Sequence, residues 1–313
     1  MKYWCACVAL LFALPARGAD LNSWAQALFA QRDALPPTVF HWEVVRKLPA
    51  RPELAAIAEA HHQARLKEAD AKRADTKTRA MYEQMHTIEK EQAKPQVINF
   101  TVAAKFINRN HFVIEQTFNP GKDAVKLEYR CHGDIVYLID ERGKRIEING
   151  QPDRFLQELL RGLPVFAFEA IYLEDFGASP ATEIALDEHA SHQRLRSRSK
   201  KGVGYELHLD KRTLAPVKCV VQYGGSTVCS IEAEGAVAGP GGSVPKRVKY
   251  EIRAPDGAIQ TEETWSLVEL APITDAASVD ASIKLKRGYH VQDRTGETIV
   301  NMTSDELLGG KAR

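Results

Sequence analysis

The chain has 313 residues, with 42 Lys and Arg against 41 Asp and Glu, and 44% of its residues are hydrophobic. Non-specific nucleic-acid binding and bulk attraction to an anionic membrane both need a strongly basic surface, so a net charge of +1 argues against both. The balance of apolar and charged residues is that of a globular protein and excludes disorder throughout.

The N-terminal segment is typical of a secretory signal peptide. A short positive start is followed by an apolar run from Cys5 to Leu14 and by small residues up to Ala19. We therefore expect residues 1–19 to be cleaved and the mature chain to be periplasmic or secreted; a retained N-terminal anchor is the alternative. No later stretch approaches the roughly 20 apolar residues of a membrane-spanning helix, so we expect no transmembrane span in the mature chain.

Two ordered segments and a long insertion follow the signal. Leu21 to Ala34 has the one-sided apolar spacing of a short amphipathic helix, and Thr38 to Val45 alternates as a half-buried strand does. Residues 51–94 are rich in alanine and in charges of both signs and lack glycine, which predicts a helical insertion. Unbroken, it would run to about 65 Å at ~1.5 Å per residue, so we expect it to break or to project. It is either a solvated arm or a recognition surface.

The rest of the chain is dominated by alternating apolar and polar residues, which predicts strands with one dry and one wet face. Ile98 to Phe106 shows this pattern clearly, and turn signals such as Gly224-Gly225 join neighbouring strands as antiparallel hairpins. Asp153 to Arg161 interrupts the series with helical spacing. The predicted fold is mainly β (α+β): a curled, unclosed antiparallel β-barrel or sheet with helices on its concave face, plus the long Ala-rich charged helical insertion.

Several segments resemble the LolA/LolB-like superfamily of periplasmic outer-membrane lipoprotein carriers. The resemblance rests on Phe-Ile-Asn-Arg-Asn-His-Phe at 106–112, on Asn119-Pro120, and on His132 to Asp140. The run from Ser282 to Asp293 is also similar to the closing strand of that family. The resemblance covers most of the chain outside the alanine-rich insertion.

The resemblance implies one domain over residues 20–313, with 51–94 inserted, in which a cavity between sheet and helices receives acyl chains. It also implies that Arg109, which matches the functional arginine of the family, holds the cover of the cavity or a ligand headgroup. A dry hollow would accept hydrocarbon, since each buried methylene contributes about 0.8 kcal/mol. The candidate ligand-binding residues are Arg109, Phe40, Trp42, Phe100, Val102, Phe106, Phe112, Ile114, Tyr129 and Tyr137.

Three arginines at every second position, Arg194, Arg196 and Arg198, share one face of a predicted strand. They form a candidate contact for a phosphate or an anionic lipid headgroup. The alternative is the solvated outer face of a hairpin.

The mature chain keeps three cysteines. Cys219 and Cys229 flank a glycine turn between two predicted strands, so we expect them to lie directly opposite each other. A disulfide between them is a candidate in an oxidising compartment, and two buried thiols are the alternative. Cys131 is left over.

Motifs of catalysis are lacking in this sequence. It contains no nucleophile elbow, no phosphate-binding glycine loop and no Cys-x-x-Cys pair, so we expect no enzyme and no cofactor. His189 and His192 lack an evident third ligand, which favours a solvated loop over a metal site. His61 and His62 point about 100° apart on a helix and cannot form one site without other residues.

The function predicted is a non-enzymatic envelope protein that binds a lipid or an acylated, lipoprotein-like ligand in an apolar cavity, as carrier or sensor. The alternative is an envelope interaction protein with a filled core that uses residues 51–94 to contact a protein partner. Nucleic acid is not an expected partner of either.

Overall fold

The computed structural model describes most of the chain from residue 36 onward. The predicted signal peptide, the helical segments at 21–34 and 153–161, and Arg109 lie outside the described residues. Those residues are 36–108, 110–121, 124–150, 183–189, 192–198, 202–210, 216–239, 242–283, 285–296 and 298–309.

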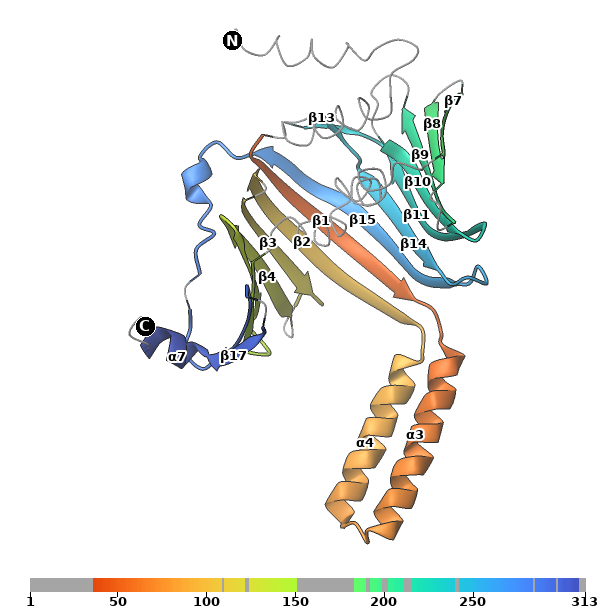
Figure 1. The fold of residues 1–313 in the computed structure, drawn as a ribbon, viewed down its shortest axis with the longest axis vertical. Helices are drawn as coiled ribbons and strands as arrows, with labels where there is room; N and C mark the ends of the chain where they lie inside the picture. Colours follow the sequence, from red (N-terminus) through yellow and green to blue (C-terminus); the bar gives the residue numbers. More distant parts are fainter. Residues whose placement is uncertain are drawn as a thin grey trace.

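One twisted sheet of 15 strands forms the body of the protein (Figure 1). Its spatial order is β17-β16-β6-β5-β4-β3-β2-β1-β15-β14-β11-β10-β9-β8-β7. The strands are β1 (Thr38–Leu48), β2 (Gln96–Asn108), β3 (His111–Phe118), β4 (Val125–His132), β5 (Ile135–Asp140), β6 (Arg145–Asn149), β7 (Glu183–Glu188), β8 (His192–Arg198), β9 (Val203–Asp210), β10 (Pro216–Tyr223), β11 (Ser226–Glu234), β14 (Arg247–Arg253), β15 (Ile259–Pro272), β16 (His290–Arg294) and β17 (Val300–Thr303). A separate two-stranded ribbon pairs β12 (Val237–Gly239) with β13 (Gly242–Val244).

The predicted curled, unclosed sheet is confirmed. β1 lies at its centre between β2 and β15, and the flanks β3–β6 and β7–β11 turn away from the plane of these central strands (Figure 1). The alternating segments form strands because each buries every second side chain, as in β2, where Phe100, Val102, Ala104 and Phe106 are buried and their neighbours are not. The predicted turns join antiparallel neighbours, including β10 and β11 at Gly224-Gly225.

The antiparallel prediction is wrong at one pair. β16 pairs with β6 in parallel, with Val291 beside Ile146. This is possible because a long connection from the end of β15 carries the chain back across the sheet before β16 begins. That connection, residues 273–289, is called the C-terminal arm below; it contains a short 3-10 turn, η2 (Ala276–Ser278). The described part of 282–289 is not a strand, so the closing strand expected from Ser282 forms only from His290.

The core lies on one face of the sheet, called the inner face below. Its buried cluster takes residues from β1 to β5 on one side and from β9 to β15 on the other. A curled sheet protects the side toward which it bends, and the opposite side carries many of the ion pairs, so we assign the apolar cluster to the inside of the curl. A second, smaller cluster of Ile146, Tyr289 and Val291 lies elsewhere, where β6 and β16 meet the C-terminal arm.

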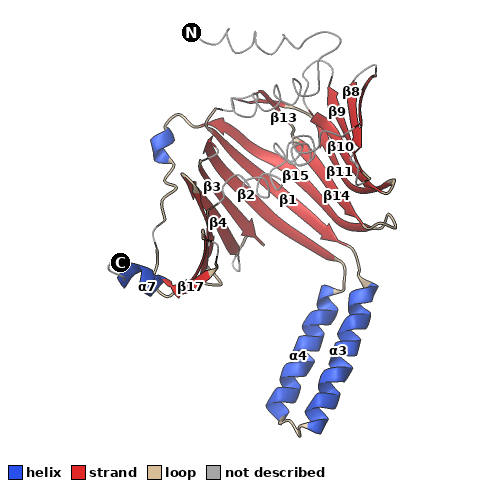
Figure 2. Ribbon diagram, viewed as in Figure 1, coloured by secondary structure: helices blue, strands red, loops and turns tan. Residues whose placement is uncertain are grey.

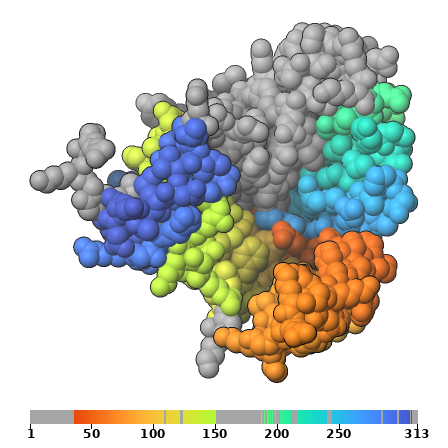
Figure 3. Space-filling view, turned by 60° about the horizontal axis from the view of Figure 1, so that its bottom comes forward, coloured from red at the N-terminus to blue at the C-terminus, as the bar shows by residue number. Residues whose placement is uncertain are grey.

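The insertion forms a helical hairpin that projects from the ends of β1 and β2 (Figures 2 and 3). Its helices are α3 (Pro52–Ala71) and α4 (Thr76–Gln92), so the predicted helix both breaks and projects. The Asp75 side chain caps α4 by accepting a hydrogen bond of 2.8 Å from the Thr78 amide. At the base, the Arg51 amide donates to the Ala93 carbonyl at 2.8 Å. A short C-terminal helix, α7 (Ser304–Gly309), ends the described chain, and no described helix has the length and apolar composition needed to cross a membrane.

Candidate ligand-binding face

The inner face brings together most of the predicted ligand-binding residues. Seven of them are 0–6% exposed and belong to one cluster: Phe40, Trp42, Phe100, Val102, Phe106, Phe112 and Ile114. Tyr129 is partly buried and packs against the same cluster. Arg109 lies outside the described residues, so its role stays a prediction.

Aromatic side chains hold the centre of this face. The rings of Trp42 and Trp265 meet edge to face with centroids 6.4 Å apart, and Phe100 meets Trp265 in the same way at 5.9 Å. The guanidinium carbon of Arg46 lies 5.1 Å from the centroid of the Phe100 ring. The indole N–H of Trp42 is buried and has no hydrogen-bond partner among the residues that the structure describes.

The inner face becomes polar toward β6 and β16. Residues that lie directly opposite each other on neighbouring strands are on the same face of the sheet. Tyr129 lies opposite Leu138, and Leu138 lies opposite Glu147, so all three are on the inner face. Arg145, two residues away on β6, pairs with Glu147 at 2.7 Å, and Arg294 of β16 approaches the same carboxylate at 3.9 Å. We call Arg145, Glu147 and Arg294 the polar margin. Burial, and then the nearby Glu147, raises the pKa of the Tyr129 hydroxyl.

Tyr137 does not belong to the inner face, so its assignment there is wrong. It lies opposite Arg130 and Ile148, whereas Tyr129 lies opposite Leu138. The sequence of β5 is apolar from Ile135 to Ile139, so alternation cannot assign its faces. Both faces of β5 carry apolar side chains, with Val136 buried in the main cluster and Ile139 packed against the second one.

The C-terminal arm covers the outer face of this flank. Arg130 donates to the carbonyls of Asp280 and Ser282, at 2.9 and 2.8 Å, and its guanidinium also bonds Glu128 at 2.7 Å. His111 Nε2 donates to the Val279 carbonyl at 2.7 Å. These contacts fasten the arm across β3 and β4.

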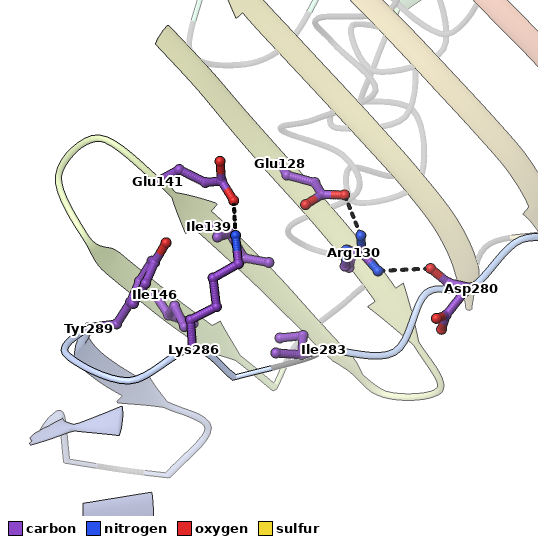
Figure 4. A pocket seen from close by; sticks show the side chains of 9 residues that line it. All are labelled: Glu128, Arg130, Ile139, Glu141, Ile146, Asp280, Ile283, Lys286 and Tyr289. Atoms are coloured by element: carbon purple, nitrogen blue, oxygen red, sulfur yellow. Dashed lines mark hydrogen bonds and ion pairs between the residues drawn. The ribbon is translucent and has the colours of Figure 1, made fainter. Parts of the chain in front are cut away.

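A pocket of about 280 Å³ lies beneath the arm (Figure 4). Ile139, Ile146 and Ile283 supply apolar lining, and the charged groups of the lining are engaged within the protein. Arg130 pairs with Glu128, Lys286 pairs with Glu141 at 2.5 Å, and the Asp280 carboxylate accepts from the amide and hydroxyl of Ser282. Ligand sites usually offer polar groups that are ready for a ligand, and pairing removes them here. We therefore place the candidate site on the inner face and not in this pocket.

The three arginines of β8 are largely engaged with carboxylates. Arg194 and Arg196 each contact Asp187 at 2.8 Å, and Arg194 also approaches Glu206 at 3.8 Å. The hydrogen bond from Arg194 is the main cause that lowers the pKa of Asp187. Arg198 is exposed. Two of the three positive charges are thus neutralised within the protein, which favours a solvated hairpin face.

Contrary to the expectation, Cys219 and Cys229 do not lie directly opposite each other. Cys219 faces Ile231 and Cys229 faces Val221. The turn between Tyr223 and Ser226 has two residues instead of the expected three, and a register shift between Val221 and Gln222 moves the pairing by one residue more. Cys131, Cys219 and Cys229, all among the described residues, are not joined in disulfides. Burial raises the pKa of both the Cys219 and the Cys229 thiols, which keeps them protonated and unreactive.

The structure adds a third histidine to the pair His189 and His192, and it brings together a second pair that the sequence did not reveal. His189 stacks on His192 with centroids 4.5 Å apart, and His192 lies 4.8 Å from His208, which comes from the next strand. His62 of α3 stacks on His86 of α4. His208 lies on another strand, and His62 and His86 lie on two helices, so only the tertiary structure could show these contacts. Among the described residues, no three His, Cys, Asp or Glu side chains surround a common metal position.

No protein-family model matches the sequence, and no curated protein is similar to it. The fold, however, is similar to solved structures of LolA-like and lipoprotein-sorting domains. A domain from Vibrio parahaemolyticus with a provisional outer-membrane lipoprotein-sorting assignment has a TM-score of 0.43 at 10% identity, over 80% of this chain and 92% of that one. A LolA superfamily protein from Nitrosomonas europaea has a TM-score of 0.40 at 11% identity, over 80% and 94%. A DUF1329 family protein from Desulfovibrio piger has a TM-score of 0.42 at 10% identity, over 84% and 100%. These similarities concern the course of the chain and assign no ligand.

Proposed function

We propose that this chain is a non-enzymatic protein of the cell envelope that carries or senses a lipid or an acylated ligand on its inner face. The observation that carries the proposal is the apolar, aromatic inner face that borders a polar margin on the same side of the sheet. An amphipathic ligand needs both kinds of surface next to each other. The signal-like N-terminus supports an envelope location.

The buried state of the inner face supports a particular mode of binding. The seven apolar residues are 0–6% exposed, so an acyl chain reaches them only when the groups packed over them move aside. Each methylene that then leaves water contributes about 0.8 kcal/mol. The affinity would come from burial of the acyl chain. The ligand would be released when the groups packed over the inner face return to their places.

Two polar features support the orientation of the ligand. The polar margin has two arginines and one glutamate, which favours an anionic headgroup there. The unpartnered indole N–H of Trp42 can donate to an ester or carboxyl oxygen, and buried donors are rarely left unpaired. The acyl chain would therefore lie across β1 to β4, and the headgroup would lie toward β6 and β16.

The direct experiment is native mass spectrometry of the protein purified from its own host. The proposal predicts a co-purifying acyl species that is released by mild denaturation. A protein that carries no such species, and that takes up no added fatty acid or lysophospholipid, would contradict it.

A charge reversal tests the orientation. Arg294→Glu should weaken binding of an anionic lysophospholipid about tenfold, because it places a second carboxylate beside Glu147. The matched control is Arg247→Glu, which changes an exposed arginine on β14 whose side chain points away from the inner face. Equal affinity for the two variants would contradict the proposed position of the headgroup.

A second function is favoured by the helical hairpin. Ile57, Met81, Met85 and Ile88 are 38–50% exposed, although they are large apolar side chains. Ile57 precedes the buried Ala58, and Met85 precedes the buried His86. In an antiparallel pair this shared offset turns both side chains to the same side of the hairpin. Such a surface would suit an envelope protein partner.

The test of this second function is a host extract passed over two immobilised proteins: the full chain, and a chain in which 51–94 is replaced by a short turn. A partner retained only by the full chain supports contact through the hairpin. The same partners on both, or none on either, would contradict it.

A further inference from the structure

The two edges of the large sheet differ in composition. The sheet ends at β7 on one flank and at β17 on the other (Figure 1). An edge strand offers backbone N–H and C=O groups to any other strand, and proteins commonly protect such edges with charged residues or proline. The sequence of β7 contains three acidic residues, Glu183, Asp187 and Glu188. Residues 299–303, called the open edge below, contain no charged residue and no proline.

The pairing of β17 with β16 shows which backbone groups of the open edge point outward. The Ser304 amide donates to the Tyr289 carbonyl at 2.8 Å, so these two residues form a hydrogen-bonded pair. Such pairs alternate along antiparallel strands, so Met302 and Val300 also bond β16. Asn301 lies between them and directs its N–H and C=O away from β16. No other strand among the described residues pairs with β17 on that side.

The side chains of the open edge are accessible as well. Ile299 is 56% exposed and Val300 is 47% exposed, and both are β-branched residues that favour strands. The helix α7 follows β17 directly but leaves them uncovered. Its Glu306 carboxylate accepts from the Thr303 amide at 2.5 Å, which closes only the C-terminal end of the open edge. The stretch around Asn301 is thus free to pair with another strand.

A second copy of the open edge is complementary to the first. An antiparallel pair with its two-fold axis at Asn301 places this residue opposite its own copy, so each N–H donates to the other C=O. Directly opposed residues share a face, so Val300 would lie beside Met302 of the second copy. Met302 already packs against the second apolar cluster, which the pairing would therefore extend. Within the open edge no like charges meet.

We infer that two copies of this chain associate through β17, in antiparallel register about Asn301, and join their sheets into one. Pairing of β17 with β7 of the next copy would not close and would lead to an open polymer. The acidic residues of β7 protect against that arrangement. Because few residues take part, the dimer is weak and its population depends on concentration. This association does not depend on ligand binding at the inner face.

Sedimentation equilibrium over a series of protein concentrations tests the inference. The average mass of the purified protein should rise from that of one chain toward that of two. Asn301→Pro should weaken the association at least about tenfold, because proline removes the N–H that donates across the two-fold axis. The pairing with β16 does not use this N–H, and proline is accepted on edge strands, so near-ultraviolet circular dichroism should stay native.

A second variant leaves the backbone unchanged. Val300→Lys adds one positive charge to each copy on the same face of the joined strands, which should also weaken the association. The matched control is Val268→Lys, because Val268 is 53% exposed but lies on β15, which is paired on both sides. This control should form the dimer as the unchanged protein does.

Two results would overturn the inference. A protein that stays monomeric up to about 1 mM has no useful affinity for a second copy, and the open edge would then serve a strand of another protein. If Asn301→Pro and Val300→Lys associate as tightly as the Val268→Lys control, another surface holds the dimer.

Discussion

The sheet and the helical hairpin bury their side chains in opposite ways. The inner face hides its largest apolar residues, with Trp42 and Phe112 fully buried. The hairpin hides alanine and histidine and exposes Ile57, Met81, Met85 and Ile88. Alternation along a strand sends half of the residues into one shared core, whereas two isolated helices can bury only a narrow seam.

This difference separates the two sources of stability. The sheet gains free energy from burial of apolar surface, which is insensitive to salt and grows with the size of the cluster. The hairpin depends on helix propensity and on polar contacts such as Arg65 with Glu89 at 2.7 Å and Arg79 with Asp70 at 2.6 Å. Exposed pairs of this kind are each worth about 0–1 kcal/mol and are weakened by salt.

The largest expected effect is on the sheet. Phe112→Ala removes a ring that is 0% exposed and should lower the free energy of unfolding by about 3–5 kcal/mol. Equilibrium denaturation in guanidinium chloride measures it. A loss below about 1 kcal/mol would mean that the inner face is loosely packed.

A smaller effect is expected on the outer face. Lys249 contacts Glu251 at 2.6 Å and Glu262 at 3.5 Å, and these two carboxylates lie directly opposite each other on β14 and β15. Lys249→Met should therefore cost about 1 kcal/mol at pH 7.

The pH dependence of this variant follows from the same contacts. The hydrogen bond from Lys249 is the main cause that lowers the pKa of Glu251 below its ordinary value of 4.5. The stabilisation is therefore present above pH 4.5 and is lost as the pH falls through the lowered value. In urea denaturation the difference in the free energy of unfolding between the two proteins should shrink as the pH falls below 4.5. A difference that does not change with pH would mean that the variant has lost packing.

Removal of the hairpin should change the stability of the sheet still less. Leu48 and Gln96 are already paired across β1 and β2, so a short turn can replace residues 51–94 without strain. A shorter loop alters the closure entropy by only about 0.6 kcal/mol for each halving of its length. Near-ultraviolet circular dichroism should report the same denaturation midpoint, and loss of the native signal would show that the hairpin is needed for the sheet to fold.

The smallest effect is expected for an apolar residue on the surface of the hairpin. Met85→Ser should change the free energy of unfolding by less than about 0.5 kcal/mol, because its side chain is 38% exposed. Thermal denaturation followed by helical circular dichroism measures it. A large loss would mean that this side chain is covered in solution.

The sequence predicts the sheet well where alternation is strict. Ile98 to Phe106 forms β2 with the expected side chains buried, because a period of two has only one face that can enter a core. The break in the helical insertion could be predicted as well, because an unbroken helix over residues 51–94 would be about 65 Å long. For the candidate site, the shared face of Phe40, Trp42 and Phe100 could be predicted in the same way.

Other features depend on contacts between distant segments. Tyr137 was assigned to the wrong face because β5 is apolar at successive positions, so alternation does not distinguish its two faces. The outer face of β5 is covered because the C-terminal arm packs on that side. The register of Cys219 against Cys229 depends on the length of the turn and on one bulge. His62 gave no sign of its partner His86, since 24 positions and a turn separate them in the chain. Periodicity describes one element at a time and cannot report which elements meet.

Quenching of tryptophan fluorescence by a brominated acyl chain tests the central claim most directly. A protein of residues 20–313 that carries Trp24→Phe retains Trp42 and Trp265, both on the inner face. A lysophospholipid with bromine on its acyl chain should quench their emission saturably, and Trp42→Phe should remove much of that quenching. Emission that stays constant over the whole titration would contradict binding of an acyl chain on the inner face.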